Sequence, residues 1–229
     1  MHNAVPMAGT RSAISLIRRV FCNFNKIDKL DMNTLTVWTN ILRNVPGSVL
    51  WLLNPAVNGV VGDDEEQDLL VNTRIRRAFS AAGIQPARLI FASRVNKAEH
   101  LTRQLAADLF LDTFVYGAHS TATDALRGGL PVLTVAGGTF PSRVVVSLYE
   151  SFYSGAKSNL QPLGSNTNHN MLVRSSVKDF EEFAVELSSP QKAHLLYDMT
   201  LILVDAVREQ IGIFDSHEQT RTFLHGMEA

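Results

Sequence analysis

Short runs of consecutive apolar residues alternate, over the first two thirds of the chain, with longer segments in which apolar residues recur every three or four positions. The continuous runs are typical of strands buried on both faces of a sheet, and the spaced pattern is typical of amphipathic helices. The five runs that predict strands are RVFCNFN (19–25), SVLWLL (48–53), RLIFAS (88–93), LFLDTFVY (109–116) and PVLTV (131–135).

Five helices are predicted between and after these strands. Pro46 and Gly47 end the first helix, and Gly83 ends the second, because these residues commonly stop helices. The alternation predicts an α/β fold with a Rossmann-like, mostly parallel sheet that carries helices on both faces. The helical segments are 32–45, 63–83, 97–108, a short helix within 117–129, and 140–153.

The last third of the chain carries helical patterns and no further strand pattern. Three helices are predicted there, at 176–189, 190–212 and 215–229, after a polar loop at 154–170. We therefore predict one domain over 19–229 that ends in a helical tail, and we leave the segment 1–18 unassigned.

Charge and cysteine content exclude several classes of protein. Lys plus Arg (21) nearly equals Asp plus Glu (22), which gives no reason to expect a nucleic-acid or membrane-surface partner. The single cysteine, Cys22, rules out a disulfide framework and a cysteine zinc cluster. The sequence also lacks an apolar run of the roughly 18 residues that would span a membrane.

Cations gather in the loops that follow two of the predicted strands. Ligands of open parallel sheets bind outside the carboxyl ends of the strands, so these loops are the candidate site. Lys26 and Lys29 follow the first strand. Lys97, His100 and Arg103 follow the third at steps of three, so they share one face of a helix near its N-terminus, where exposed amides favour an anion.

A second helix start follows the fourth strand, in GAHSTATD (117–124). Ser120 or Thr121 is the natural cap, and small residues here let a phosphate approach the backbone. Taken singly, these residues fit plain roles: caps, a loop histidine at 119, a helix-dipole acid at Asp124, and surface charges elsewhere. The sequence has no GxGxxG or P-loop motif. The combination predicts a nucleotide-diphosphate site.

Five segments resemble the C-terminal catalytic half of the O-GlcNAc transferase family, the UDP-GlcNAc:protein O-linked N-acetylglucosaminyltransferases. They cover roughly 21–148 in the order of the family. The resemblance implies the nucleotide-sugar-binding half of a GT-B glycosyltransferase. The segments are FCNFNKIDKLD, WTNILRNVPGSVLWLL, EHLTRQLAADLFLDT, GAHSTATDALRGGLPVLT and GGTFPSRVVVSL.

The resemblance assigns one group of residues to the diphosphate and the sugar. Lys29 matches the lysine that faces the diphosphate, and it is the expected catalytic residue. Lys26 stands where animal enzymes have glutamine, also near the phosphates. His119 matches the histidine of the family's HTT motif, at the sugar and phosphate end. Ser120 and Thr121 match its two threonines, whose backbone amides hold phosphate.

A second group is assigned to the nucleoside. Lys97 and Asp124 match residues around the ribose, and His100 and Arg103 match residues around the uracil. The family's reaction is inverting transfer of GlcNAc from UDP-GlcNAc to a Ser or Thr hydroxyl of a protein, without a required metal. The resemblance thus implies UDP-GlcNAc as donor substrate, no other cofactor, and a cytoplasmic or nuclear location.

This chain departs from the family in several respects. Arg127 stands where the family usually has tryptophan, and 1–18 matches no segment of it. The other catalytic half and the tetratricopeptide helices, which contact acceptor proteins, are absent, so we expect the chain to be inactive alone. Two alternatives stay open: a non-catalytic nucleotide-binding module, and a SPINDLY-like protein O-fucosyltransferase that uses GDP-fucose.

Overall fold

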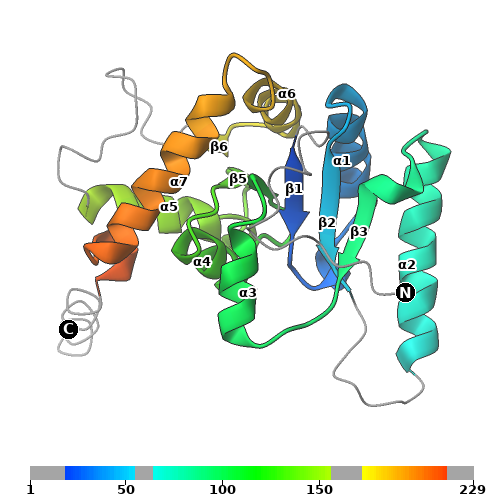
Figure 1. The fold of residues 1–229 in the computed structure, drawn as a ribbon, viewed down its shortest axis with the longest axis horizontal. Coiled ribbons are helices and arrows are strands. Elements are labelled where there is room, and N and C mark those ends of the chain that lie inside the picture. Colours follow the sequence, from blue (N-terminus) through cyan, green and yellow to red (C-terminus); the bar gives the residue numbers. More distant parts are fainter. Residues whose placement is uncertain (1–18, 55–63, 156–171, 216–229) are drawn as a thin grey trace.

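Six parallel strands form one sheet in the order β3-β2-β1-β4-β5-β6 (Figure 1). The computed structural model describes residues 19–54, 64–155 and 172–215. The parallel arrangement confirms the sheet predicted from the continuous apolar runs. The strands are β1 (Val20–Asn23), β2 (Val49–Leu53), β3 (Leu89–Ala92), β4 (Leu109–Leu111), β5 (Val132–Val135) and β6 (Val173–Arg174).

Helices cover both faces of this sheet. Right-handed crossovers place the helices of the β1–β2–β3 half on one face and, after the order reverses, those between β3 and β5 on the other. Figure 1 shows α1 and α2 beside β2 and β3, and α7 running along α4 and α5. The helices are α1 (Met32–Asn44), α2 (Asp64–Ala81), α3 (Lys97–Gln104), α4 (Ser120–Arg127), α5 (Val144–Gly155), α6 (Val177–Leu187) and α7 (Ala193–Arg208).

The core lies between the central strands and these helices. Every residue of β1, β2 and β4 is buried, which explains why their sequences are continuously apolar. Cys22 pairs in register with Trp51 of β2 on one side and with Phe110 of β4 on the other. From α1, Trp38 and Ile41 are fully buried against the sheet. Among the described residues, no helix is both long and apolar enough to span a membrane.

The structure differs from the sequence-based elements in several places, and α3, for example, ends at Gln104 rather than at residue 108. The fourth strand ends at Leu111 rather than at residue 116, because the carboxylate of Asp112 accepts hydrogen bonds from two backbone amides of the following loop and turns the chain. The short strand β6 was not predicted, since its two residues carry no recognisable pattern. The unassigned segment 1–18 and the third predicted tail helix, except for its first residue, lie outside the described residues.

Two positions on α1 test the placement of the core. Ile41 is fully buried, whereas Met32 on the same helix is 70% exposed. Ile41→Ala should lower the free energy of unfolding by about 2–5 kcal/mol, because it leaves a cavity as well as removing apolar contacts. Met32→Ala should change it by less than about 0.5 kcal/mol. Urea denaturation followed by circular dichroism measures both, and equal losses would contradict this packing.

Candidate functional site

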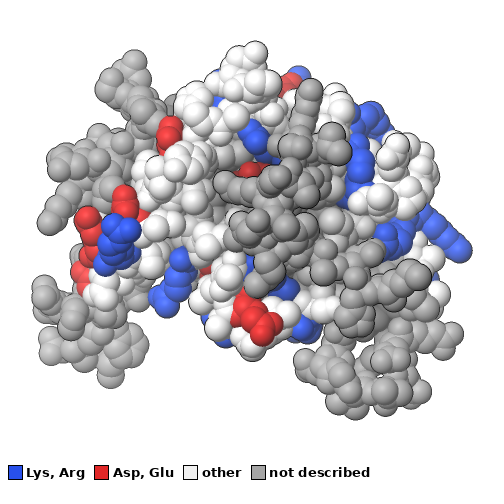
Figure 2. Space-filling view, in the orientation of Figure 1, with Lys and Arg blue, Asp and Glu red and all other residues white. Residues whose placement is uncertain are grey.

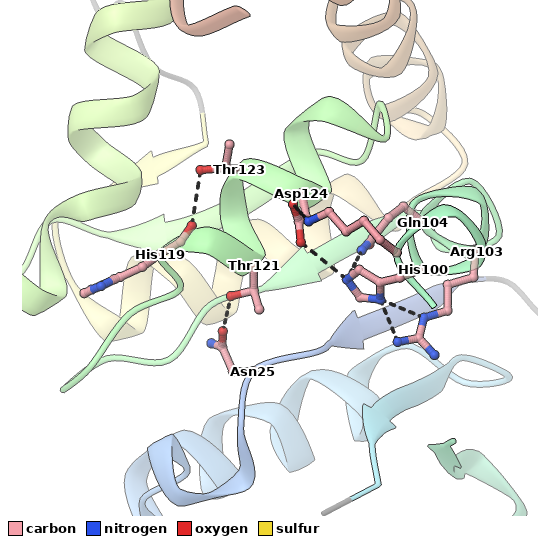
Figure 3. A network of polar contacts seen from close by, with 9 residues as sticks. Asn25, His100, Arg103, Gln104, His119, Thr121, Thr123 and Asp124 are labelled. Atoms are coloured by element: carbon pink, nitrogen blue, oxygen red, sulfur yellow. Dashed lines mark hydrogen bonds and ion pairs between the residues drawn. The ribbon is translucent and has the colours of Figure 1, made fainter. Parts of the chain in front are cut away.

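The candidate site lies where the strand order reverses, between β1 and β4. At this point the connections leaving neighbouring strands diverge to opposite faces and leave room for a ligand beyond the carboxyl ends. Two side-chain contacts join the connections. Lys29, in the 3₁₀ turn Ile27–Lys29 after β1, donates from Nζ to the carbonyl oxygen of Gly117 at 2.8 Å. Thr121 of α4 donates from its hydroxyl to Oδ1 of Asn25 (Figure 3).

Lys29 is a half-buried cation at this junction. Its Nζ lies 4.2 Å from the centre of the Tyr116 ring, which adds a cation–π contact to the hydrogen bond with Gly117. Burial lowers the pKa of Lys29, and the nearby carboxylates of Asp112 and Asp28 oppose this effect. A partly shielded ammonium attracts an anion more strongly than one in bulk water. Lys26, by contrast, is exposed at the N-cap of the same turn.

The start of α4 carries no side-chain cap. The expectation that Ser120 or Thr121 caps this helix is wrong: the N-cap is His119, which makes no side-chain capping bond, and the Thr121 hydroxyl donates to Asn25 instead. Ala122 and Thr123 donate their amides to the carbonyl of His119. The amides of Ser120 and Thr121, in the first turn, have no intrahelical acceptor and are free to bind an anion.

His119 lies in a short series of rings at the edge of this helix start. Its imidazole stacks on Tyr116 with 4.8 Å between the ring centres, and Nε2 lies 3.1 Å from the carbonyl oxygen of Pro141. Phe140, which is 81% exposed, also approaches the His119 ring edge-on, with 6.5 Å between the ring centres. His119 is therefore held in place by neighbours from two loops.

The start of α3 differs from the start of α4. Asn96 caps it by accepting a hydrogen bond from the amide of Glu99 at 3.0 Å, and the Glu99 carboxylate accepts one from the Asn96 amide group. The amides expected to be open at the start of α3 are therefore partly occupied. What α3 contributes is its side chains: Lys97 forms an ion pair with Asp124, which links α3 to α4.

His100 and Arg103 form a compact cluster beside this ion pair (Figure 3). Arg103 donates to Nδ1 of His100 from Nε at 3.0 Å and from Nη2 at 2.6 Å, and from Nη1 to the carbonyl oxygen of Ser93 at 2.8 Å. The guanidinium lies 4.6 Å from the centre of the Phe24 ring. These contacts fix a flat, cationic surface next to an imidazole.

The contacts of His100 determine its protonation. Burial, assisted by the charge of Arg103, lowers the pKa of His100 to about 4, so the ring is neutral at pH 7. Because Arg103 can only donate, Nδ1 is the acceptor and Nε2 carries the proton. The amide nitrogen of fully buried Gln104 lies 3.1 Å from Nε2 of His100, and turning the amide group by 180° lets its oxygen accept a hydrogen bond from this N–H. Asp124 lies farther off, at 3.9 Å.

The structure thus gathers most of the predicted residues into two adjoining groups. One group contains Lys29, His119, Ser120 and Thr121, and the other contains Lys97, His100, Arg103 and Asp124.

Several residues that shape the site were not predicted from the sequence. Asp112 was assigned to a strand, although an acid inside an apolar run at the carboxyl end of a strand is a usable signal. Arg127, where the family has tryptophan, is exposed in the last turn of α4.

Acidic and basic side chains both occur on the face drawn in Figure 2, in keeping with their nearly equal numbers. Anion binding must therefore come from local groups such as Lys29 and the start of α4.

The model of glycosyl transferase family 41 matches residues 8–222 of the chain. The chain belongs to glycosyl transferase family 41.

Curated relatives within family 41 are much longer than this chain. The probable UDP-N-acetylglucosamine–peptide N-acetylglucosaminyltransferase SEC of Arabidopsis thaliana is 33% identical over 169 residues, which are 74% of this chain and 15% of the plant protein. The corresponding transferase of Caenorhabditis elegans is 39% identical over 128 residues, or 56% of this chain and 10% of that protein. A SPINDLY protein of rice is 29% identical over 129 residues.

Solved structures confirm the fold. An O-GlcNAc transferase from Thermobaculum terrenum superposes with a TM-score of 0.63 at 24% identity, covering 81% of this chain and 31% of that one. HepE of Anabaena, in complex with UDP, superposes with a TM-score of 0.59 at 10% identity, covering 94% of this chain and 50% of that one. Family 41 membership and these likenesses agree on a GT-B glycosyltransferase domain.

The protonation of His100 can be read by nitrogen NMR. We expect a titration midpoint near 4, with protonated Nε2 and unprotonated Nδ1 above it. Arg103→Met should raise the midpoint, because Arg103 lowers this pKa. In the unfolded chain the imidazole of His100 binds a proton below its ordinary pKa of 6.5, whereas in the folded chain it does so only below about 4. The stability contributed by neutral His100 is therefore lost as the pH falls from 6.5 to about 4. A midpoint near 6.5 in the parent would contradict this environment.

Proposed function

We propose that this chain is the donor-binding domain of a protein O-GlcNAc transferase and binds UDP-GlcNAc in the crevice between β1 and β4. The diphosphate would lie at the uncapped start of α4, within reach of Lys29. Lys97 and Asp124 would flank the ribose, and His100 and Arg103 the uracil. The observation that carries the proposal is the contact of Lys29 with Gly117, which places a half-buried cation beside open helix amides.

The reaction would transfer GlcNAc, with inversion, to a Ser or Thr hydroxyl of an acceptor protein. Negative charge then develops on the departing UDP, at its β-phosphate. Preorganised cations and amides are the groups that such a step requires, and Lys29 with the amides of Ser120 and Thr121 would supply them. In this proposal these groups take the place of a metal ion. His119, held by Tyr116 and Pro141, would lie at the sugar end, with Lys26 near the phosphates.

We also propose that transfer needs groups beyond this chain. The chain spans 15% of the Arabidopsis relative and 10% of the nematode one, so most of each relative has no counterpart here. A GT-B enzyme reacts its substrates in a cleft between two domains, and the acceptor protein would bind mainly to the other one. The proposed setting is the cytoplasm or the nucleus, where such acceptors occur.

Nucleotide selectivity tests the donor assignment. UDP should bind the 229-residue chain more tightly than GDP or ADP, because the family resemblance assigns His100 and Arg103 to the uracil. Isothermal titration calorimetry with the three diphosphates measures this directly. Preference for GDP would favour a SPINDLY-like donor instead, and equal affinities would remove the assignment of the base-binding end.

The charge of Lys29 should matter more to the rate than to donor affinity. Lys29→Met keeps most of the stem and removes the cation. In an intact enzyme that contains this domain, we expect the single-turnover rate to fall about 100- to 1000-fold, as for the loss of one oxyanion donor, with a smaller loss of UDP affinity.

The matched control is Lys178→Met, because Lys178 is an exposed lysine on α6 with 84% of its side chain accessible. This control should leave both the rate and the affinity unchanged. A rate for Lys29→Met within about threefold of the parent, well below the loss expected for an oxyanion donor, would remove Lys29 from the mechanism.

A further inference from the structure

The loop between β4 and α4 is built around one buried carboxylate. Asp112 follows β4 directly and is 1% exposed. Its Oδ1 accepts hydrogen bonds from the amides of Thr113 at 2.8 Å and Ala118 at 2.7 Å. Its Oδ2 accepts one from the hydroxyl of Thr134, on β5, at 2.7 Å. Both ends of the loop and the neighbouring strand are therefore attached to the same side chain.

The middle of the loop lies against this carboxylate as well. A Cβ atom at Gly117 would come within 3.1 Å of Oδ2 of Asp112 and within 3.1 Å of the carbonyl oxygen of Pro141, so a side chain here would force these neighbours to shift by a few tenths of an ångström. The amide of Gly117 donates to Pro141 at 2.9 Å. The hydroxyl of Thr113 donates to the carbonyl of Tyr116 at 2.6 Å. The loop thus has one closely determined path.

This path leads to both groups that would hold a diphosphate. Gly117 presents its carbonyl to Nζ of Lys29 at 2.8 Å, and Ala118 immediately precedes the N-cap of α4. In addition, the carboxylate of Asp112 favours the charged form of Lys29. Burial raises the pKa of Asp112 to about 6, because it disfavours the charged carboxylate, and the hydrogen bonds from Thr134, Ala118 and Thr113 oppose this effect.

We propose that Asp112 is a positioning residue for donor binding: its buried carboxylate fixes the loop so that the first amides of α4 and the ammonium of Lys29 face the diphosphate. The inference rests on the proposed donor site and adds to it a residue that touches neither sugar nor nucleotide. Its role is geometric. A neutral side chain with the same shape and a carbonyl acceptor should therefore replace it, whereas truncation should not.

The test compares UDP with uridine, which lacks the diphosphate, on the full chain. Asp112→Ala should weaken UDP binding by about tenfold or more, the loss expected when hydrogen bonds to a charged group disappear, and should change uridine binding by less than about twofold. Asp112→Asn keeps an oxygen that can accept from both amides. It should bind UDP within about threefold of the parent.

Asp108 supplies the matched control. Asp108 directly precedes β4, whereas Asp112 directly follows it. Oδ2 of Asp108 also accepts a backbone hydrogen bond, from the amide of Val20 at 2.7 Å, but this bond lies at the amino edge of the sheet, away from the proposed site. Asp108→Ala should leave the ratio of UDP to uridine affinity unchanged. If Asp112→Ala does not fold, Gly117→Ala provides a second test, because its methyl group would press on Oδ2 of Asp112 and on the carbonyl oxygen of Pro141 and should weaken UDP binding selectively.

Several results would overturn the proposal. The first is an Asp112→Ala variant that binds UDP within about threefold of the parent, or that loses equal affinity for UDP and for uridine. The second is an Asp112→Asn variant that binds UDP as weakly as Asp112→Ala. The third is a folded Gly117→Ala variant that binds UDP with the affinity of the parent. If the parent binds UDP no more tightly than uridine, the proposed diphosphate site itself is wrong and this inference fails with it. Normal parental binding with an unaffected Asp112→Ala variant overturns the inference alone.

Discussion

The contact between the connections that leave β1 and β4 is the constraint on which the rest of the site depends. Parallel neighbours deliver their carboxyl ends to the same edge of the sheet, and the reversal of strand order at β1 sends their connections to opposite faces. Without bridging contacts the two connections would diverge. The hydrogen bonds from Lys29 to Gly117 and from Thr121 to Asn25 hold them together, and thereby place a cation beside an uncapped helix start.

Burial acts on the charge of three groups in the site. Burial lowers the pKa of Lys29 and of His100 and raises that of Asp112, because in each case burial disfavours the charged form. For Asp112 the sign is opposite to that of His100: stability is lost as the pH rises from about 4 to 6, because the folded state then binds more protons than the unfolded one. Perturbed groups gathered in one crevice are typical of functional sites.

The sequence predicted the parts of this molecule that depend on local pattern. Continuous apolar runs located β1 and β2, because every residue there is buried on both faces. The end of β4 was not predicted, since the turn after Leu111 depends on donors as far along the chain as Ala118 and Thr134. The tautomer of His100 likewise depends on how Arg103 points, which no residue spacing specifies.

Chemical-shift mapping tests the central claim, that a uridine nucleotide binds at the junction of β1 and β4. In a ¹⁵N-labelled chain titrated with UDP, the account predicts that the amides of Ala118, Ser120 and Thr121 shift most, because they border the proposed diphosphate. The amides of Val20 and Asp108, at the amino edge of the sheet, should stay in place. Shifts concentrated at that amino edge, or no saturable shift at the start of α4, would contradict the account.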